Sequence, residues 1–300
     1  MKNIILNCRV RIFGVLRGLV LHLPLGFRRG SGFYRFFRQG IYDFLKPKIN
    51  FQVSVKGHRM LVPGKDRAIT DELMTPGRFE PFETRLFESA VKKGMTVVDV
   101  GANFGYYTLL AARLAGPSGK VYDFEPDEDN YKLLSENVSR NGYTNVVLER
   151  AAVSRGSGTQ TLFRDALNYG AHSLSQANLQ MGQQSSIVCR TVSLDDYFAD
   201  KPGRIDIIKI DVQGAEGLAF EGAQKLIKQN KYLRILLEFW PSGLLQMQTD
   251  PVEFLHHFEK QGFRIRLITP GGLQPAGDIA ELVRKLEKNL HVNLLIEGGI

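Results

Sequence analysis

The chain of 300 residues contains little cysteine, and Cys8 and Cys189 are its only two cysteines. So few cysteines exclude a scaffold held together by disulfides and favour a reducing compartment, which predicts a cytoplasmic protein. Glycine and proline occur at ordinary levels, with 30 and 12 residues. Collagen-like and proline-rich low-complexity sequences are therefore excluded as well.

Long apolar runs are also absent. The most apolar stretch, residues 12–27, is interrupted by Arg17, His22 and Pro24. A helix that spans a bilayer needs about 20 largely apolar residues, so we expect no transmembrane helix. A signal peptide is not expected either, because Arg17 breaks the apolar region and no small-residue cleavage site follows it.

Acidic residues are almost missing from the first 50 positions. This segment has ten Lys and Arg residues and one acid, Asp43, whereas the other 250 residues carry 29 basic and 30 acidic side chains. We expect residues 1–50 to form a basic amphipathic extension. Such a segment suits peripheral contact with the inner face of a membrane, or it packs as a helix on the main domain. Because the rest of the chain is nearly neutral, we expect no nucleic-acid partner.

Strand-like and helix-like segments alternate from residue 80 onward. The predicted strands are Thr96–Val100, Lys120–Phe124, Asn145–Leu148, Ile205–Ile210, Arg234–Phe239, Phe263–Ile268 and His291–Ile296. The predicted helices are Pro81–Lys93, Tyr106–Ala115, Asp127–Asn141, a helix from the turn at Gly214 to about Gln229, Val252–Gln261 and Ile279–Lys288. This alternation predicts an α/β, doubly wound, Rossmann-like fold whose mainly parallel sheet has seven strands, the last of them antiparallel.

Three segments are expected around this core. Residues 1–50 form the extension, 51–79 form a β-hairpin around Lys56-Gly57 followed by a linker that is a loop from Pro63 to Pro76, and 80–300 form the catalytic domain. Within that domain, residues 161–190 are rich in Ser, Gln, Asn and Gly. A long irregular stretch inside a compact domain is usually functional, so we expect a lid-like insertion there.

A glycine-containing turn follows the first predicted strand of the domain. It reads Gly101-Ala-Asn-Phe-Gly105, which places ligand-accessible backbone where doubly wound sheets bind nucleotides. The G-x-x-x-G spacing differs from the dinucleotide fingerprint, since Asn103 replaces a glycine, and no Walker lysine follows. The turn therefore argues against NAD, FAD and nucleoside triphosphates.

The second predicted strand is followed by Glu125-Pro126, 24 positions after Gly101. A carboxylate at this place can accept both hydroxyl groups of an unmodified ribose. The alternative is that Glu125 caps the next helix, but Asp127 is better placed for that role.

Taken together, Asp99-Val-Gly-Ala-Asn-Phe-Gly105 and Glu125-Pro resemble the motifs of class I S-adenosylmethionine-dependent methyltransferases. The resemblance implies that the turn with Gly101 and Gly105 passes beside the methionine end of the cofactor, supported by Asp99. It further implies that Asn103 and Tyr106 lie near the cofactor and that Ala152 flanks the adenine.

A sharper resemblance is carried by Asp206-Ile-Ile-Lys-Ile-Asp-Val-Gln-Gly-Ala-Glu216. This segment is similar to the signature of the FkbM family of methyltransferases, with Gln213 in place of the family's usual first Glu. The resemblance covers roughly residues 80–300. It implies methylation of a hydroxyl group on a sugar, a glycolipid or polysaccharide, or a polyketide-like acceptor.

Candidate catalytic groups lie at the carboxyl ends of the fourth and fifth strands of the domain. Lys209 and Asp211 face the same side of one strand, and Glu238 ends the next. A hydroxyl acceptor needs a general base or a metal, so Lys209 and Asp211 are a candidate base and partner. Alternatively, Asp211 and Glu238 hold Mg²⁺, or the Lys209–Asp211 pair is only structural.

Two further side chains are candidates by type alone. His172, in the predicted lid, is a candidate base because the reference pKa of histidine is near neutrality. Trp240 either packs in the core or stacks on a sugar ring. The histidines show no metal-ligand spacing with cysteine, which argues against zinc.

The sequence therefore predicts an S-adenosylmethionine-dependent O-methyltransferase. The competing hypotheses are an NAD(P)-dependent oxidoreductase on the same fold and a non-catalytic scaffold. The sequence does not indicate the identity of the acceptor or the oligomeric state.

Overall fold

The computed structural model describes residues 46–74, 79–179, 184–201, 203–286 and 290–299. The chain divides into two compact units, residues 1–79 and 80–300. Most of the predicted basic extension, residues 1–45, lies outside the described residues, so its helical character and its membrane contact stay predictions.

The first unit contains the predicted hairpin. β1 (Phe51–Val55) pairs antiparallel with β2 (His58–Val62) around the turn at Lys56-Gly57, as expected. The loop expected after it is interrupted by a short helix, α4 (Ile69–Leu73). The Asp66 carboxylate accepts a hydrogen bond from the backbone N–H of Thr70 at 2.5 Å, which satisfies a free donor of the first turn. A five-residue helix is too short to show a sequence period.

The second unit is built on an eight-stranded sheet. Its strands are β3 (Thr96–Val100), β4 (Lys120–Phe124), β5 (Val146–Glu149), β9 (Ile207–Ile210), β10 (Arg234–Phe239), β11 (Arg264–Thr269), β12 (Gly272–Pro275) and β13 (Val292–Glu297). Their spatial order is β12-β11-β13-β10-β9-β3-β4-β5. The seven predicted strands are all present, and the last, β13, is antiparallel to β10 as predicted. β12 is an additional edge strand paired with β11.

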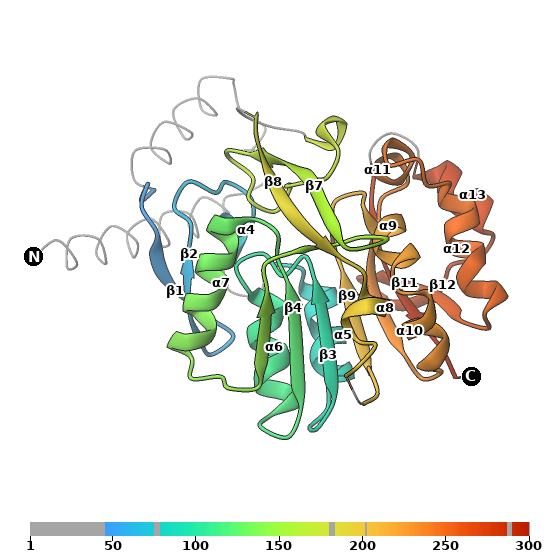
Figure 1. The fold of residues 1–300 in the computed structure, drawn as a ribbon, viewed down its shortest axis with the longest axis horizontal. Helices are drawn as coiled ribbons and strands as arrows, with labels where there is room; N and C mark the ends of the chain where they lie inside the picture. The colour runs from blue at the N-terminus through green and yellow to red at the C-terminus, as the bar shows by residue number, and fades with distance from the viewer. Residues whose placement is uncertain (1–45, 75–78, 180–183, 202, 287–289, 300) are drawn as a thin grey trace, which may run out of the picture. The chain divides into compact units, whose positions relative to one another are not determined.

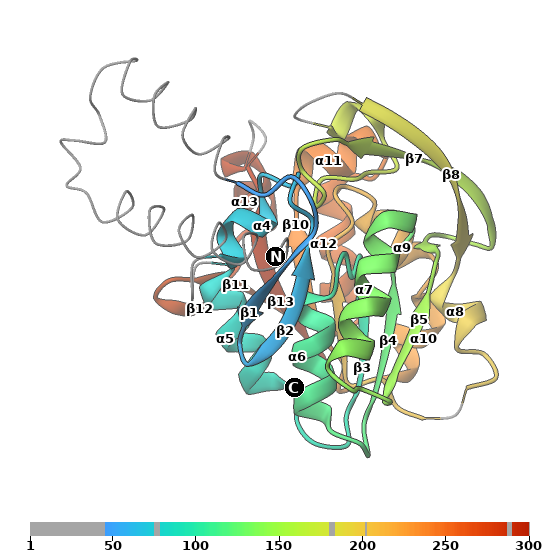
Figure 2. The same cartoon turned by 90° about the vertical axis from the view of Figure 1, so that its left-hand side faces the viewer.

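Helices cover both faces of this sheet (Figure 2). The helices of the unit are α5 (Pro81–Ala90), α6 (Tyr106–Ala115), α7 (Glu128–Arg140), α8 (Leu194–Tyr197), α9 (Glu216–Glu221), α10 (Gln224–Gln229), α11 (Pro241–Gln246), α12 (Pro251–Lys260) and α13 (Ile279–Lys285). The helix predicted up to Gln229 is split into α9 and α10. The largest apolar core lies between the sheet and α9, α10, α12 and α13, whereas α5 and α6 lie on the side of Asp99 and Thr108. The doubly wound fold is thus as predicted.

A small second sheet replaces much of the predicted irregular lid. β7 (Gly158–Asp165) and β8 (Gln184–Val192) form a long antiparallel ribbon, and β6 (Ala152–Val153) pairs parallel with β8. Figure 1 shows this ribbon at one end of the central strands. The expectation of an irregular segment over 161–190 is wrong for the strands, because both ribbon faces are largely exposed and so lack a period-two apolar pattern. The ladder hydrogen bonds hold the ribbon instead. Between β7 and β8, the described residues 166–179 contain a short 3₁₀ helix, Gln176–Asn178, and form no further helix or strand.

Within the described ranges, no helix has the length and apolar character needed to cross a bilayer.

Candidate active site

The turn after β3 is held close to the end of β9. Gly101 and Gly105 have φ values of +85° and +97°, a region that favours glycine. A Cβ on Gly101 would lie 2.0 Å from the backbone oxygen of Asp211, and one on Gly105 would lie 2.7 Å from Leu134. Glycine at position 101 therefore lets the predicted cofactor turn approach the predicted catalytic strand, and glycine at position 105 lets it approach α7.

Asn103 and Glu125 are joined at this turn. Asn103 is one of few non-glycine residues with positive φ (+53°), and its backbone N–H donates to Oε2 of Glu125 at 2.8 Å. Oε1 of Glu125 accepts from the backbone N–H of Asp127 at 2.8 Å. Glu125 is only 4% exposed, and burial raises its pKa to about 8. Two backbone donors and a side-chain hydrogen bond with Asn130 use part of the acceptor capacity of this carboxylate, and the rest is left for a ligand donor.

Asp127 caps α7, as the sequence predicts. Its side chain accepts hydrogen bonds from the backbone N–H groups of Asp129 and Asn130, both at 3.0 Å. Glu125 therefore does not cap the helix, although its carboxylate fixes the chain at the turn and at the start of α7.

Below the turn, Asp99 and Asp123 are buried side by side on paired strands. The hydroxyl of Thr108 lies 3.2 Å from Asp99 and 3.0 Å from Asp123. Burial raises the pKa of Asp99 to about 6, and burial together with the charge of Asp99 raises the pKa of Asp123 well above its usual value. Asp99 thus lies directly before the glycine turn and is hydrogen-bonded to Thr108 of α6, the helix that follows the turn.

The connection between β7 and β8 lies over the turn and over the end of β9. The backbone oxygen of Tyr169 accepts hydrogen bonds from the side-chain amides of Asn103 (2.8 Å) and Asn130 (3.2 Å). Farther along, the Ser173 hydroxyl and the Asn178 amide donate to the backbone oxygen of Gln213 at 2.7 and 3.0 Å. One segment therefore ties together the two predicted parts of the site.

Lys209 and Asp211 form an ion pair at the end of β9. Their Nζ and Oδ2 atoms are 3.2 Å apart, and Nζ lies 4.7 Å from the centre of the Tyr107 ring. Burial opposes the charge of Lys209, but Asp211, Glu80 and Asp99 outweigh it and raise the pKa of the ammonium. Burial also opposes the charge of Asp211, but Lys209 and a hydrogen bond from Gln213 lower its pKa. The raised pKa favours the charged form of Lys209, which suits a partner of Asp211 better than a base, and the catalytic roles of both residues stay predictions.

Gln213 bridges Asp211 and Glu238. Its amide nitrogen donates to Oδ1 of Asp211 at 2.8 Å and to Oε2 of Glu238 at 2.6 Å. Burial, followed by the charge of Asp211, raises the pKa of Glu238 well above its usual value. An amide N–H₂ group thus occupies the place where a cation shared by the two carboxylates would lie. Among the described residues, no group of three or more His, Cys, Asp or Glu side chains is arranged to hold a metal, so the Mg²⁺ hypothesis finds no support here.

Glu80 and Tyr107, which the sequence analysis does not single out, belong to the same cluster. The Tyr107 hydroxyl donates to Oε2 of Glu80 at 2.6 Å. Both residues line a small pocket together with Lys209, Asp211 and Glu238. The only local signal for Glu80 is its position directly before Pro81, which opens α5. Its approach to β9 depends on tertiary packing.

The described contacts of three other predicted residues do not include the carboxylates of Glu125 and Asp211, and the roles of these residues stay predictions. The described contacts of His172 stay within its own segment, where Nδ1 lies 3.2 Å from the backbone N–H of Asp165 and the ring contacts Tyr169. The Tyr106 hydroxyl pairs with Thr84 of α5 at 3.0 Å. Ala152 packs with Leu162 and Cys189 in the small sheet.

Trp240 is only 5% exposed, and its ring packs against Gly243. Of the two roles that the sequence leaves open for Trp240, this contact favours packing over stacking on a sugar ring.

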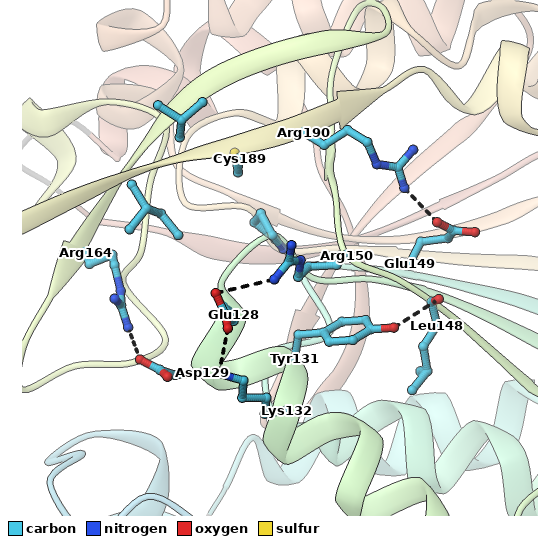
Figure 3. Close-up of a pocket in the computed structure, with 13 residues that line it drawn as sticks. Glu128, Asp129, Tyr131, Lys132, Leu148, Glu149, Arg150, Arg164, Cys189 and Arg190 are labelled. Atoms are coloured by element: carbon cyan, nitrogen blue, oxygen red, sulfur yellow. Dashed lines mark hydrogen bonds and ion pairs between the residues drawn. The ribbon is translucent and has the colours of Figure 1, made fainter.

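A larger pocket, of about 600 Å³, lies between the start of α7, the end of β5 and the β7–β8 ribbon (Figure 3). Its charged side chains are largely paired, as Figure 3 shows for Arg150 with Glu128 at 3.4 Å and Arg190 with Glu149 at 2.7 Å. Because these pairs leave little net charge, the pocket does not by itself indicate a charged ligand. None of the predicted site residues lines it.

The sequence of the chain is similar to those of known methyltransferases. Among curated relatives, a protein-L-isoaspartate O-methyltransferase of Methanococcoides burtonii is 38% identical over 19% of this chain and 29% of its own length. Methyltransferase sdnD of Sordaria araneosa is 25% identical over 49% of this chain and 68% of its own length. The match to this chain covers only 15% to 29% of the length of three curated relatives.

Among solved structures, a SAM-dependent O-methyltransferase of Thermotoga maritima matches with a TM-score of 0.41 and 14% identity, covering 87% of this chain and 82% of that one. The model of the methyltransferase FkbM domain matches residues 99–265, which run from the acid below the glycine turn to β11 and make up more than half of the chain. The chain therefore belongs to the FkbM family of methyltransferases.

Proposed function

We propose that this protein transfers a methyl group from S-adenosylmethionine to a hydroxyl oxygen of a sugar, a glycolipid or polysaccharide, or a polyketide-like acceptor. The observation that carries the proposal is the packing of Gly101 against the backbone oxygen of Asp211. It brings the glycine turn and the polar cluster of Asp211, Gln213 and Glu238 to the same edge of the sheet. The name of one curated relative, an O-methyltransferase, agrees with an oxygen acceptor.

The residues at the turn fit the cofactor by their chemistry. Glu125 can accept ribose hydroxyl groups, and hydrogen bonds of this kind favour its charged form. Oδ1 of Asn130 is buried and has no hydrogen-bond partner among the described residues, so an acceptor for a ligand N–H or O–H lies nearby. When bound, the cofactor supplies a methyl group on a positively charged sulfur. Glu125, Asn103 and Asn130 would hold its nucleoside part.

The cluster at β9 and β10 suits an acceptor rich in hydroxyl groups. Asp211 stays ionised and accepts hydrogen bonds, while the raised pKa of Glu238 favours its protonated form, which can also donate. Such a mixture of donors and acceptors can bind several hydroxyl groups and orient one of them for in-line attack. The β7–β8 connection, tied down at Gln213, would help to exclude water from the reacting oxygen.

Isothermal titration with S-adenosylhomocysteine and with NADH tests the cofactor. Binding of the first and not of the second is expected, and the reverse would favour the oxidoreductase hypothesis. Methyl glycosides and glycolipids are then incubated with S-adenosylmethionine and the protein, and products are sought by a mass gain of one CH₂ group. Asp211→Asn should lose turnover and keep cofactor binding, whereas a non-catalytic scaffold would give no product with either protein.

The acceptor could be presented at a membrane. The excess of basic residues in positions 1–50 supports contact with anionic lipid, although this segment mostly lies outside the described residues. Flotation of the full chain with phosphatidylglycerol vesicles, but not with phosphatidylcholine vesicles, is expected. Equal behaviour with both would favour packing of the segment on the protein itself.

A further inference from the structure

Glu80 has a backbone conformation that a glutamate rarely adopts. Its φ and ψ angles are 38° and 61°, in the left-handed region, directly before Pro81. Non-glycine residues in this region cost of order 1–3 kcal/mol and are retained where the surroundings fix them, often at functional sites. Two of the other positive-φ residues of this type are Asn103 and Gln213, which both belong to the candidate site. The remaining two in the described chain, Lys56 and Gln248, are not among the candidate site residues, so three of the five positions belong to the site.

The carboxylate of Glu80 is held by a fixed donor. Tyr107 is 6% exposed, and its ring packs edge-on against Phe87 and Tyr106 with centroids 5.0 and 5.1 Å apart. Its hydroxyl donates to Oε2 of Glu80 at 2.6 Å. Within the described part of the chain, Oε1 of Glu80 accepts no hydrogen bond. One oxygen is thus anchored and the other is left for a ligand.

The other carboxyl groups that line the pocket are engaged by neighbouring side chains, and among them Oε1 of Glu83 accepts a hydrogen bond from Asn293 at 3.0 Å. Lys209 is charged, and Asp211 has both carboxylate oxygens engaged, by Lys209 and by Gln213. Glu238 has Oε2 bonded to Gln213 and Oε1 at 3.6 Å from Nε2 of His291. Burial raises the pKa of Glu80 to about 7, with Lys209 opposing that effect. The groups that face Glu80 from α5, α6, β9 and β10 are Glu83, Tyr106, Tyr107, Lys209, Asp211 and Glu238.

We propose, on the basis of the function proposed above, that Glu80 is the general base for the acceptor hydroxyl and that Tyr107 positions its carboxylate. In this step the acceptor oxygen forms a bond to the methyl carbon. The carbon–sulfur bond breaks and its electron pair stays on sulfur. The O–H bond of the acceptor breaks as well, and its proton goes to Oε1 of Glu80, which later releases it to solvent.

The test compares Glu80→Gln and Tyr107→Phe with the unchanged protein, using S-adenosylmethionine and the best methyl glycoside of the acceptor panel. Glu80→Gln should lower kcat by about 10²- to 10⁴-fold, the usual contribution of a general base, and leave the Kd of S-adenosylhomocysteine within about twofold. The rise of kcat with pH near 7 should disappear. Tyr107→Phe should move that rise to higher pH, because it removes a hydrogen bond that favours the carboxylate. Glu88 lies on α5, the helix that Glu80 precedes, and pairs with Arg113. Glu88→Gln is therefore the matched control and should behave like the unchanged protein.

Two results would overturn the role of Glu80. An unchanged kcat in Glu80→Gln would show that the base lies elsewhere, and weaker S-adenosylhomocysteine binding at unchanged kcat would make Glu80 a cofactor ligand. If Glu80→Gln does not fold, as judged by circular dichroism, the pH profile of Tyr107→Phe decides, and an unmoved profile contradicts the proposal. A failure of the unchanged protein to bind the cofactor or to methylate any glycoside overturns the proposed function together with this one. Normal turnover by both the unchanged protein and Glu80→Gln overturns the role of Glu80 alone and leaves the proposed function standing.

Discussion

The side-chain amide nitrogen of Gln213 lies 2.6 Å from Oε2 of Glu238 and donates a hydrogen bond to it. The same nitrogen reaches Asp211 at 2.8 Å, so a neutral group joins two carboxyl groups. The amide nitrogen faces Asp211 because this ionised carboxylate can only accept hydrogen bonds. In the FkbM signature that this segment resembles, a glutamate is usual at the position of Gln213. The residue at position 213 therefore decides whether two or three carboxyl groups meet here.

Gln213→Glu should create a site for a divalent cation. Three carboxyl groups at this edge would repel one another, and a hard cation with oxygen ligands relieves that repulsion. We expect Mn²⁺ binding by Gln213→Glu in isothermal titration, and no Mn²⁺ binding and no effect of EDTA on turnover for the unchanged protein. Gln246→Glu adds the same charge at an exposed position of α11 and serves as control. Equal Mn²⁺ binding by all three proteins would contradict the bridging role of the amide.

Cofactor affinity should depend on pH through Glu125. Its pKa of about 8 in the ligand-free protein means that the carboxyl group is largely protonated at pH 7. Ribose hydroxyl groups favour the charged form, so the complex binds fewer protons and affinity should rise as the pH rises toward 8, by up to about tenfold per pH unit. Calorimetric titration with S-adenosylhomocysteine from pH 6 to pH 9 measures this slope. Glu125→Gln should flatten it and weaken binding by roughly 10- to 100-fold at pH 8.5. A slope that persists in the variant would assign the titrating group elsewhere.

The central strands and the cofactor turn could be predicted because their signals are local. β3, β4 and β10 have the predicted bounds, since each is a short apolar run between clear turn residues. The position of Asp127 predicts the start of α7, and its side chain is observed to cap that helix. β3 and β4 also have parallel neighbours on both sides, and strands buried in this way have continuous apolar sequences.

The missed features depend on contacts between distant segments. The β7–β8 ribbon is held by backbone hydrogen bonds between its two strands. These bonds produce no alternating apolar pattern in a strand whose residues are largely polar and exposed. Glu80 and Lys209 are 129 positions apart in the sequence and line one pocket because α5 packs against α6 and β11. The pKa values of Glu80 and Glu238 follow from burial, which a side chain's type and neighbours in sequence do not reveal.

Glu216 should reduce stability at alkaline pH. Its Oε1 atom accepts from the backbone N–H groups of Val212 and Gly214 at 3.2 and 3.1 Å, while its buried Oε2 atom has no partner among the described residues. Burial raises its pKa to about 7. The folded protein then holds a proton that the unfolded chain releases, so the contribution of Glu216 to stability is full below pH 4.5 and is lost as the pH rises through 7.

Glu216→Gln keeps an acceptor oxygen and removes the titration. We expect the variant to unfold with nearly unchanged free energy at pH 5 and to be more stable at pH 8, by roughly 1–3 kcal/mol. Urea unfolding at the two pH values measures the difference. Glu221→Gln, at the exposed end of the same helix, should show no such difference between the two pH values. A loss of stability at both pH values would mean that the carboxylate itself holds the turn.

Asn178 should anchor the β7–β8 connection to the catalytic edge. Its amide donates to the backbone oxygen of Gln213 at 3.0 Å, and the residue is 3% exposed. Asn178→Ala leaves that oxygen with the Ser173 hydroxyl as its remaining side-chain donor, and loss of a buried hydrogen bond costs about 1–3 kcal/mol. We expect faster amide hydrogen exchange over 167–179, with exchange in β3 and β4 unchanged, because the opening is local. Gln176→Ala, at an exposed position of the same connection, is the matched control. Faster exchange throughout the sheet would instead mean that Asn178 stabilises the whole domain, and the connection would then not be an independently opening cover of the site.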